Sequence, residues 1–274
     1  ITSLQNDIPF DLSPILPLSF QKIENWVNAF FKEKISLQRK VRKLKKEEAF
    51  NSQNYLKFVT LFSSLINADK NQAALKEKVI IEREDLLPNL VDNYKQKMNF
   101  PKSDLNDLRD EAYLEAESKL KEANSRVFSL NLPTGLGKTL IAYNLALKLR
   151  SIREKEFGYK ARIIYSLPFI SVIDQNFDIF QKVIEKENQN NSNLIIKHHS
   201  STELKYKTSD YEFDDNQSEL LIEGWNAEII CTTFVQFFQT LLSNKNSNLR
   251  RFHQLNNSII ILDEIQQIPI EYWK

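Results

Sequence analysis

From about residue 127 onward, short apolar runs alternate with stretches in which apolar residues recur every three or four positions. The runs are predicted strands and lie at 127–132, 162–167, 194–198, 228–231 and 258–262. The periodic stretches are predicted helices and lie at 140–150, 171–184 and 233–242. This alternation is typical of a parallel sheet with right-handed crossovers, so we expect an α/β fold. The unbroken run Ile259-Ile260-Ile261-Leu262 suits a central strand that is covered on both faces.

The chain before residue 127 shows a different pattern, which predicts helices without strands. Residues 1–20 have no helical period and are expected to be extended, whereas 21–81 repeat apolar residues at steps of three and four. A basic stretch at 32–46 is either a solvated helix face or a contact for phosphates. A polar connector between Pro88 and Pro101 marks the expected domain boundary, and a helix is predicted at 103–123.

Composition narrows the class of protein only moderately. The net charge is +1 and 27% of the residues are charged, which neither requires nor excludes a nucleic-acid partner. The single cysteine, Cys231, excludes a disulfide framework and is expected to be a small core residue. No apolar run approaches the roughly 20 residues that span a bilayer. We therefore expect a cytoplasmic protein without a membrane partner.

Glycine is rare in this chain, and two of its four glycines fall in the run Leu132-Pro133-Thr134-Gly135-Leu136-Gly137-Lys138-Thr139. An extended segment precedes this run and a helical one follows it, which is the context of a phosphate-binding loop. Bare backbone amides and a helix N-terminus favour an anion there. We predict that ATP binds at this loop, with Lys138 on the β- and γ-phosphates and the Thr139 hydroxyl on Mg²⁺. The predicted nucleotide-binding residues are Thr134, Gly135, Leu136, Gly137, Lys138 and Thr139.

A second candidate element is the acidic pair Asp263-Glu264, which directly follows the last predicted strand. Open α/β sheets bind their ligands at the carboxyl ends of the strands. Asp263 is a candidate ligand for Mg²⁺, and Glu264 is a candidate group to orient or deprotonate the attacking water. Taken alone, such a pair is also compatible with a helix cap; the phosphate loop upstream favours the catalytic interpretation.

Together these two elements resemble motifs I and II of superfamily 2 helicases. The segments between them are similar to one family, the CRISPR-associated HD nuclease–helicases of type I interference systems. The similar segments are 133–139, 164–171 with Asp174 and Gln175, 198–201, 232–238 and 263–266. The resemblance implies a first RecA-like helicase lobe at 86–274. It also implies catalytic roles for Lys138 and Glu264.

The resemblance further implies a motor that pulls single-stranded DNA after recruitment by an RNA-guided, Cascade-type surveillance complex. Candidate DNA contacts are hydroxyl and amide side chains that follow strand ends. They are Ser171, Ser200, Thr232, Thr233 and Gln236. A helix N-cap is the alternative for each of them, and for Ser171 and Thr233 the two interpretations are equally good and compatible.

Residues 1–85 resemble the C-terminal part of the same family's HD nuclease domain, mainly through the segment 61–69. Asp69 continues the apolar stripe of Phe62 and Leu65, and the matching aspartate of the family is a metal ligand. An exposed Asp69 at a helix end is an equally good interpretation. All three histidines lie after residue 197, so a nuclease metal needs histidines that are supplied from elsewhere.

We expect the chain to be a fragment, because the family's motor has a second lobe that supplies catalytic arginines. The remaining part of the same helicase is then a required partner, and this chain alone is expected to be inactive or weakly active. Two alternatives stay open. One is an RNA helicase lobe of the DEAD-box type, although Ile265-Gln266 departs from its Asp-Glu-Ala-Asp motif. The other is a non-catalytic module that docks on a surveillance complex or on DNA.

Overall fold

The computed structural model describes residues 28–29, 32, 36, 39, 52–75, 81–122, 125–184, 191–200 and 205–272. The chain forms two compact units, Ile1–Phe58 and Val59–Lys274. Nearly all of the described structure lies in the second unit; the predicted extended segment at 1–20 and most of the basic stretch at 32–46 lie outside the described residues. The family-based boundary near residue 85 stays a prediction. Among the described helices, none is long and apolar enough to cross a membrane.

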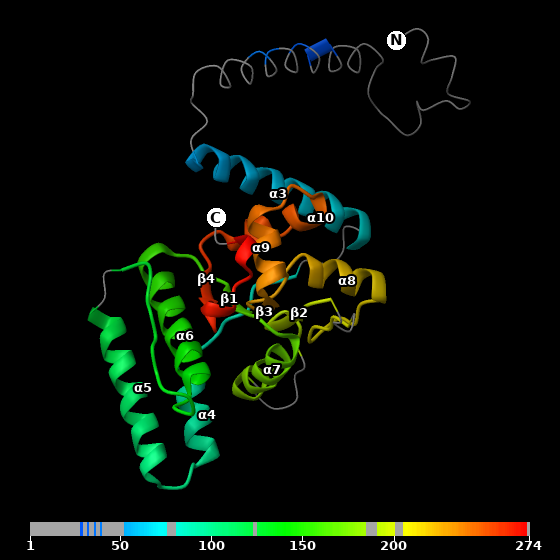
Figure 1. Cartoon of the computed structure of the whole chain (residues 1–274). Helices are drawn as coiled ribbons and strands as arrows, with labels where there is room; N and C mark the ends of the chain where they lie inside the picture. The colour runs from blue at the N-terminus through cyan, green and yellow to red at the C-terminus, as the bar shows by residue number, and fades with distance from the viewer. Residues whose placement is uncertain are drawn as a thin grey trace. The chain divides into compact units, whose positions relative to one another are not determined.

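The second unit is built on a four-stranded parallel sheet (Figure 1). Its strands are β1 (Ile163–Leu167), β2 (Ile195–His198), β3 (Ile229–Thr233) and β4 (Ile259–Leu262), in the spatial order β2-β3-β1-β4. In the register, Tyr165 pairs with Cys231 on one side and Ile261 on the other. The predicted α/β fold is thereby confirmed.

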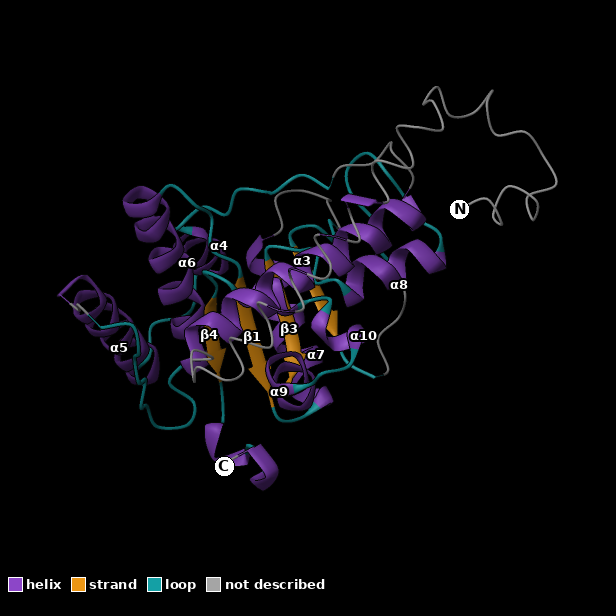
Figure 2. Cartoon of the chain, turned by 90° about the horizontal axis from the view of Figure 1, so that it is seen from above, coloured by secondary structure: helices purple, strands orange, loops and turns teal. Residues whose placement is uncertain are grey.

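Helices cover the sheet on both faces, as the view in Figure 2 shows. The described helices are α3 (Ser52–Leu75), α4 (Leu90–Met98), α5 (Asp104–Glu122), α6 (Lys138–Phe157), α7 (Ile170–Ile184), α8 (Asp215–Glu223), α9 (Phe234–Leu242) and α10 (Asn246–Leu249). Short 3-10 helices follow at Phe252–Leu255, Ile265–Gln267 and Ile270–Tyr272. Helices α4, α6 and α7 pack on one face, and α8 and α9 pack on the other.

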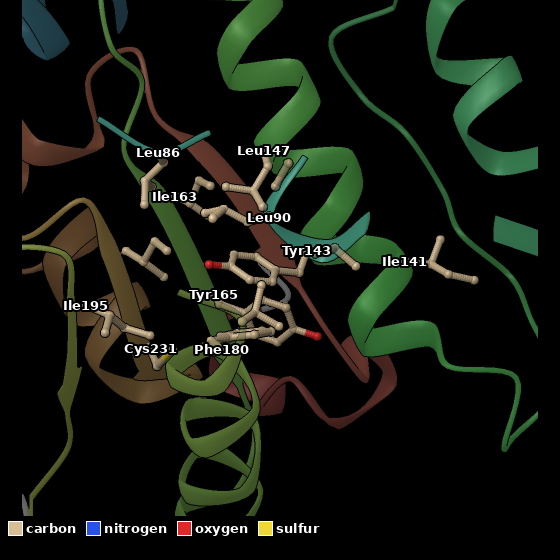
Figure 3. Close-up of a cluster of buried hydrophobic side chains, with 14 of the residues drawn as sticks. Leu86, Leu90, Ile141, Tyr143, Leu147, Ile163, Tyr165, Phe180, Ile195 and Cys231 are labelled. Carbon is tan, nitrogen blue, oxygen red and sulfur yellow. The ribbon is translucent and has the colours of Figure 1, made fainter. Parts of the chain in front are cut away.

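The two cores follow from the alternation of side chains along each strand. On β1, Ile163, Tyr165 and Leu167 contribute to the core under α6 and α7, which is drawn in Figure 3. Ile164 of the same strand contributes to the opposite core, with Trp225 and Phe237. All five residues of β1 are buried, which explains why this strand is mostly apolar rather than alternating. Cys231 is also a buried core residue, as predicted.

Two strand predictions were wrong. Strand β4 is an edge strand rather than a central one, and Ile260 is 42% exposed. The segment 127–132 is extended but carries no strand assignment. Its Leu130 and Leu132 pack against the core while Val127 and Phe128 are exposed. Apolar composition identified both segments correctly as extended, but it does not say which neighbour each one pairs with.

Two helices were missed because their sequences read as polar connectors. Helix α8 begins inside the acidic stretch 210–219, whose composition favours a surface loop. Its N-cap Asp214 accepts a hydrogen bond from the backbone N–H of Gln217, and Asp215 occupies the first turn. Acidic side chains at a helix N-terminus are favourable for both capping and the helix dipole. Helix α4 lies between Pro88 and Pro101, and its first residues, Leu90 and Val91, are buried.

A buried ion cluster fixes the segment before α4 to the sheet. Glu228, at the start of β3, accepts hydrogen bonds from Arg150 of α6 at 2.8 Å and from Arg83 at 2.6 Å. The side chains of Glu228 and Arg150 are each 1% exposed. Burial alone would raise the pKa of Glu228, but the hydrogen bonds and charges of the two arginines outweigh it and lower that pKa.

A buried histidine and a partly buried one predict a loss of stability in mild acid. Burial, with the nearby charges of Arg251 and His199, lowers the pKa of His198 to about 3. Burial, with the charge of Arg162, lowers the pKa of His253 to about 4. The unfolded chain takes up protons below its ordinary histidine pKa of about 6.5, whereas the folded chain does not. We therefore expect the free energy of unfolding to fall between pH 7 and pH 5, by about 2 kcal/mol for each of the two histidines.

Urea unfolding at pH 7 and pH 5 measures this loss. In His253→Gln, the free energy of unfolding should fall less between pH 7 and pH 5, because the contribution of His253 is removed. An unchanged difference in the variant would contradict the assignment of the effect to His253.

Candidate nucleotide-binding site

The predicted phosphate loop forms an open turn at the N-terminus of α6. Gly135 and Gly137 have φ angles of 90° and 75°, a region that strongly favours glycine. A Cβ atom added at either glycine would meet nothing within 4 Å, so the face of the loop is open. Gly137 is the N-cap residue and Lys138 begins the helix. The first N–H groups of α6 have no partner within the helix and are available to an anion.

The acidic pair lies directly after β4, and the structure brings it to the loop. The Nζ atom of Lys138 is 3.9 Å from Oε1 of Glu264. Glu264 has a φ of 56°, in the left-handed region that is unfavourable for a residue with a Cβ atom. Strained backbone of this kind is common at functional sites. Gln266 donates a hydrogen bond of 2.5 Å to the second oxygen of the Glu264 carboxylate.

Tyr165 of β1 connects the loop with the acidic pair. Its hydroxyl donates to Oδ2 of Asp263 at 2.7 Å, and the side chain of Thr139 lies near enough to the same phenol to act on its pKa, in the lowering direction. Burial, followed by the negative charge of Asp263, raises the pKa of Tyr165 well above its ordinary value. The phenol is therefore a permanent donor at neutral pH. Thr139 and Asp263, predicted to share one magnesium ion, thus both lie close to this side chain.

A pocket of about 1030 Å³ lies in front of these groups. All six predicted nucleotide-binding residues line it, together with Asp263, Glu264 and the segment that joins α4 to α5. Arg109 of α5 donates a hydrogen bond from Nε to the backbone oxygen of Gly135 at 2.8 Å. This bond fixes the phosphate loop to helix α5. The volume is at the upper end of the range for small-molecule sites and suits a nucleotide.

The residues at this site fit both ATP and Mg²⁺. The open glycine loop and Lys138 offer backbone and charged donors to phosphate oxygens. The Thr139 hydroxyl and the Asp263 carboxylate are oxygen ligands of the kind that Mg²⁺ takes. Mg²⁺ is commonly bound through one or two such groups together with substrate phosphates, so the donor set is sufficient.

Comparison with known proteins agrees with this geometry. Residues 102–273 match the family described as type III restriction enzyme, res subunit. The chain belongs to this family. The match begins just before α5 and extends past Glu264, so it includes every group of the pocket described above except those of α4 and of Asn99, Phe100 and Pro101.

The chain is also similar to the CRISPR-associated nuclease/helicase Cas3 of Haloferax volcanii. The two are 28% identical over an alignment of 232 residues that covers 77% of this chain and 25% of that protein. The chain therefore spans about a quarter of the length of this relative. The resemblance of the motifs to CRISPR-associated nuclease–helicases is confirmed. Residues 102–273, which match the family, form a helicase-like ATP-binding lobe.

The five candidate nucleic-acid contacts lie near the carboxyl ends of the strands, but their hydroxyls and amides are not equally accessible. Ser171 and Ser200 are exposed. Thr233 caps α9, where its hydroxyl accepts from the N–H of Gln236, and the amide oxygen of Gln236 accepts from Arg251. Both residues are partly exposed.

Thr232 differs from the expectation of an accessible phosphate contact. Its side chain is fully buried, and its hydroxyl donates to the backbone oxygen of His198 at 2.9 Å. That hydroxyl is used within the sheet in this structure and does not face solvent.

The structure places Asp69 on the exposed surface of α3. The apolar stripe that suggested a buried Asp69 is itself exposed, since Leu65 is 67% exposed. The buried positions of this helix are Val59, Ser63, Asn67 and Leu75 instead. Within the part of the chain that the structure describes, no group of three or more histidine, cysteine, aspartate or glutamate residues could bind a metal.

Sequence reasoning did not single out Tyr165 and Arg109 as site residues. Tyr165 lies inside a segment that resembles a helicase motif, within the predicted strand 162–167. A tyrosine hydroxyl usually finds a hydrogen-bond partner when it is buried. The need of this hydroxyl for a partner was the signal in the sequence that could have pointed to Tyr165.

Proposed function

We propose that this chain is the ATP-binding lobe of an ATP-dependent translocase or helicase that moves on single-stranded DNA. In this proposal it acts with an HD nuclease in DNA degradation during CRISPR interference. The observation that carries the proposal is the meeting of Lys138, Thr139, Asp263 and Glu264 in one pocket, although the two pairs are far apart in sequence.

In this assignment the chain's own groups bind ATP and prepare its hydrolysis. The amides of 134–139 and the ammonium group of Lys138 bind the phosphates. Thr139 and Asp263 would hold Mg²⁺, which neutralises charge on the phosphates when bound. Glu264 orients the attacking water and accepts its proton. The second lobe, as the remaining part of the same helicase, supplies arginines that stabilise the transition state.

DNA binding is proposed at the carboxyl ends of the strands. Four of the candidate side chains are at least partly exposed there and could contact a DNA strand: Ser171, Ser200, Thr233 and Gln236. Their hydroxyl and amide groups suit contacts with phosphate oxygens rather than with base edges. Recruitment by an RNA-guided, Cascade-type surveillance complex belongs to the same proposal. A metal at Asp69 remains conditional on histidines from elsewhere.

ATP hydrolysis with and without nucleic acid tests the proposal. The chain should bind a fluorescent ATP analogue, and together with the second lobe it should hydrolyse ATP faster with single-stranded DNA than with RNA of the same length. Stimulation by RNA alone would favour the DEAD-box alternative. Nucleotide binding without any turnover in the two-lobe protein would favour a docking module, and failure to bind nucleotide would overturn the proposal.

A further inference from the structure

The hydroxyl of Tyr165 is fixed in position by its surroundings. The side chain is 0% exposed. Its ring packs edge-on against Phe180 of α7, with ring centroids 4.9 Å apart. The residue also lies on β1, which is hydrogen-bonded to strands on both sides. A side chain confined in this way has one rotamer available, so its hydroxyl presents a donor at a fixed point.

That donor is directed at one oxygen of Asp263. The other oxygen of the carboxylate accepts the N–H of Glu264 at 3.0 Å. The backbone N–H of Asp263 donates to the carbonyl of Ser166, at 3.1 Å. Asp263 and its neighbour Glu264 lie in a turn after an edge strand, with Glu264 in a left-handed conformation. The rigid support for the carboxylate therefore comes from β1, through Tyr165.

We propose that Tyr165 is a positioning residue that orients the Asp263 carboxylate toward Thr139 for the magnesium of bound nucleotide. This inference rests on the proposed function of the site. Tyr165 would not touch the metal or the phosphates. It would act through Asp263, as partners of metal ligands commonly do when they fix a ligand's orientation. Thr139 also lies near this phenol and lines the same pocket as Asp263, so a carboxylate held by Tyr165 is held close to the second predicted ligand.

The same core contains a tyrosine that serves as a matched control. Tyr143 of α6 is also 0% exposed and also packs on Phe180, with centroids 4.3 Å apart. Its hydroxyl finds no hydrogen-bond partner among the described residues. The two phenol oxygens point in opposite directions (Figure 3). Removing the oxygen from Tyr143 therefore changes the core in the same way without changing the support of Asp263.

The test compares Tyr165→Phe with Tyr143→Phe in the 274-residue chain. Affinity for a fluorescent ATP analogue is measured in EDTA and again across a titration with MgCl₂. We expect Tyr165→Phe to require about tenfold more Mg²⁺ for the same affinity, since loss of a ligand's supporting partner commonly weakens metal binding 10- to 100-fold. Binding in EDTA should match that of Tyr143→Phe, and thermal unfolding should show both variants folded at the temperature of the titration.

The variant Asp263→Asn distinguishes positioning from packing. If Tyr165 acts through Asp263, adding Tyr165→Phe to Asp263→Asn should cause no further loss of Mg²⁺ dependence. An unchanged Mg²⁺ requirement in Tyr165→Phe, with a normal response in the unmodified chain, would overturn the positioning role and leave the proposed function standing. Equal losses in EDTA and in Mg²⁺ would also overturn it. An unmodified chain that binds no nucleotide would overturn the role and the proposed function together.

Discussion

Replacing Lys138 by alanine is expected to abolish measurable ATP binding while the fold stays intact. Lys138 is the cation of the phosphate loop, and its ammonium group would contact two phosphate groups. Charge-assisted hydrogen bonds contribute roughly 1.5–3 kcal/mol each, so losing two of them weakens binding by about 100-fold or more. The side chain is 33% exposed, and its ion pair with Glu264 is long, at 3.9 Å. Its removal should therefore have little effect on stability.

Titration with a fluorescent ATP analogue in the presence of MgCl₂ measures the effect, and thermal unfolding checks the fold. Lys155→Ala is the matched control, because Lys155 is an exposed lysine near the other end of the same helix. The control removes the same charge and should bind nucleotide normally. Unchanged nucleotide affinity in Lys138→Ala would refute the assignment of the phosphate loop.

The parts of the fold that the sequence predicts best are those with a local signal. Gly135 and Gly137 were identified as loop residues because glycine is rare in this chain and these two lie between an extended and a helical segment. Both have positive φ angles, which few other residues accept. Strands β1, β2 and β3 were located to within about two residues because buried parallel strands are continuously apolar. The helices between them followed from periodicity.

The parts that were missed depend on contacts between distant segments. The bond between Tyr165 and Asp263 joins residues 98 positions apart, and Arg109 reaches the loop from another helix. Strand β4 has the composition of a central strand, but its place at the edge depends on which strands pair with it. Thr232 follows a strand-end pattern typical of ligand contacts, yet its hydroxyl is used by the neighbouring strand.

Glu264 illustrates how a local rule and a functional requirement conflict. The acidic pair predicted a site at the end of a strand, which agrees with the pocket. Sequence gave no indication of the left-handed backbone at Glu264. That conformation costs roughly 1–2 kcal/mol for a residue with a Cβ atom. It turns the carboxylate toward the Lys138 side of the pocket rather than into a regular helix, which supports a role in chemistry over a role as a cap.

Replacing Glu264 by glutamine should keep ATP bound and block its hydrolysis in a protein that combines this chain with the second lobe. Glutamine has nearly the same shape, and Glu264 is 44% exposed, so the fold loses only a weak ion pair. A neutral amide cannot accept a proton from water, and the loss of a general base reduces rates roughly 100- to 10,000-fold. Hydrolysis is measured as phosphate release with single-stranded DNA, and binding is measured with the fluorescent analogue.

The matched control is Glu271→Gln, which removes another exposed carboxylate from the same C-terminal segment, outside the residues that line the pocket. This variant should hydrolyse ATP at the normal rate, so that a general loss of negative charge is separated from the loss of a base. If Glu264→Gln weakened nucleotide binding instead, the carboxylate would act in binding through Lys138. If hydrolysis stayed normal, Glu264 would have no part in activating water, and the base would have to come from another group near Asp263.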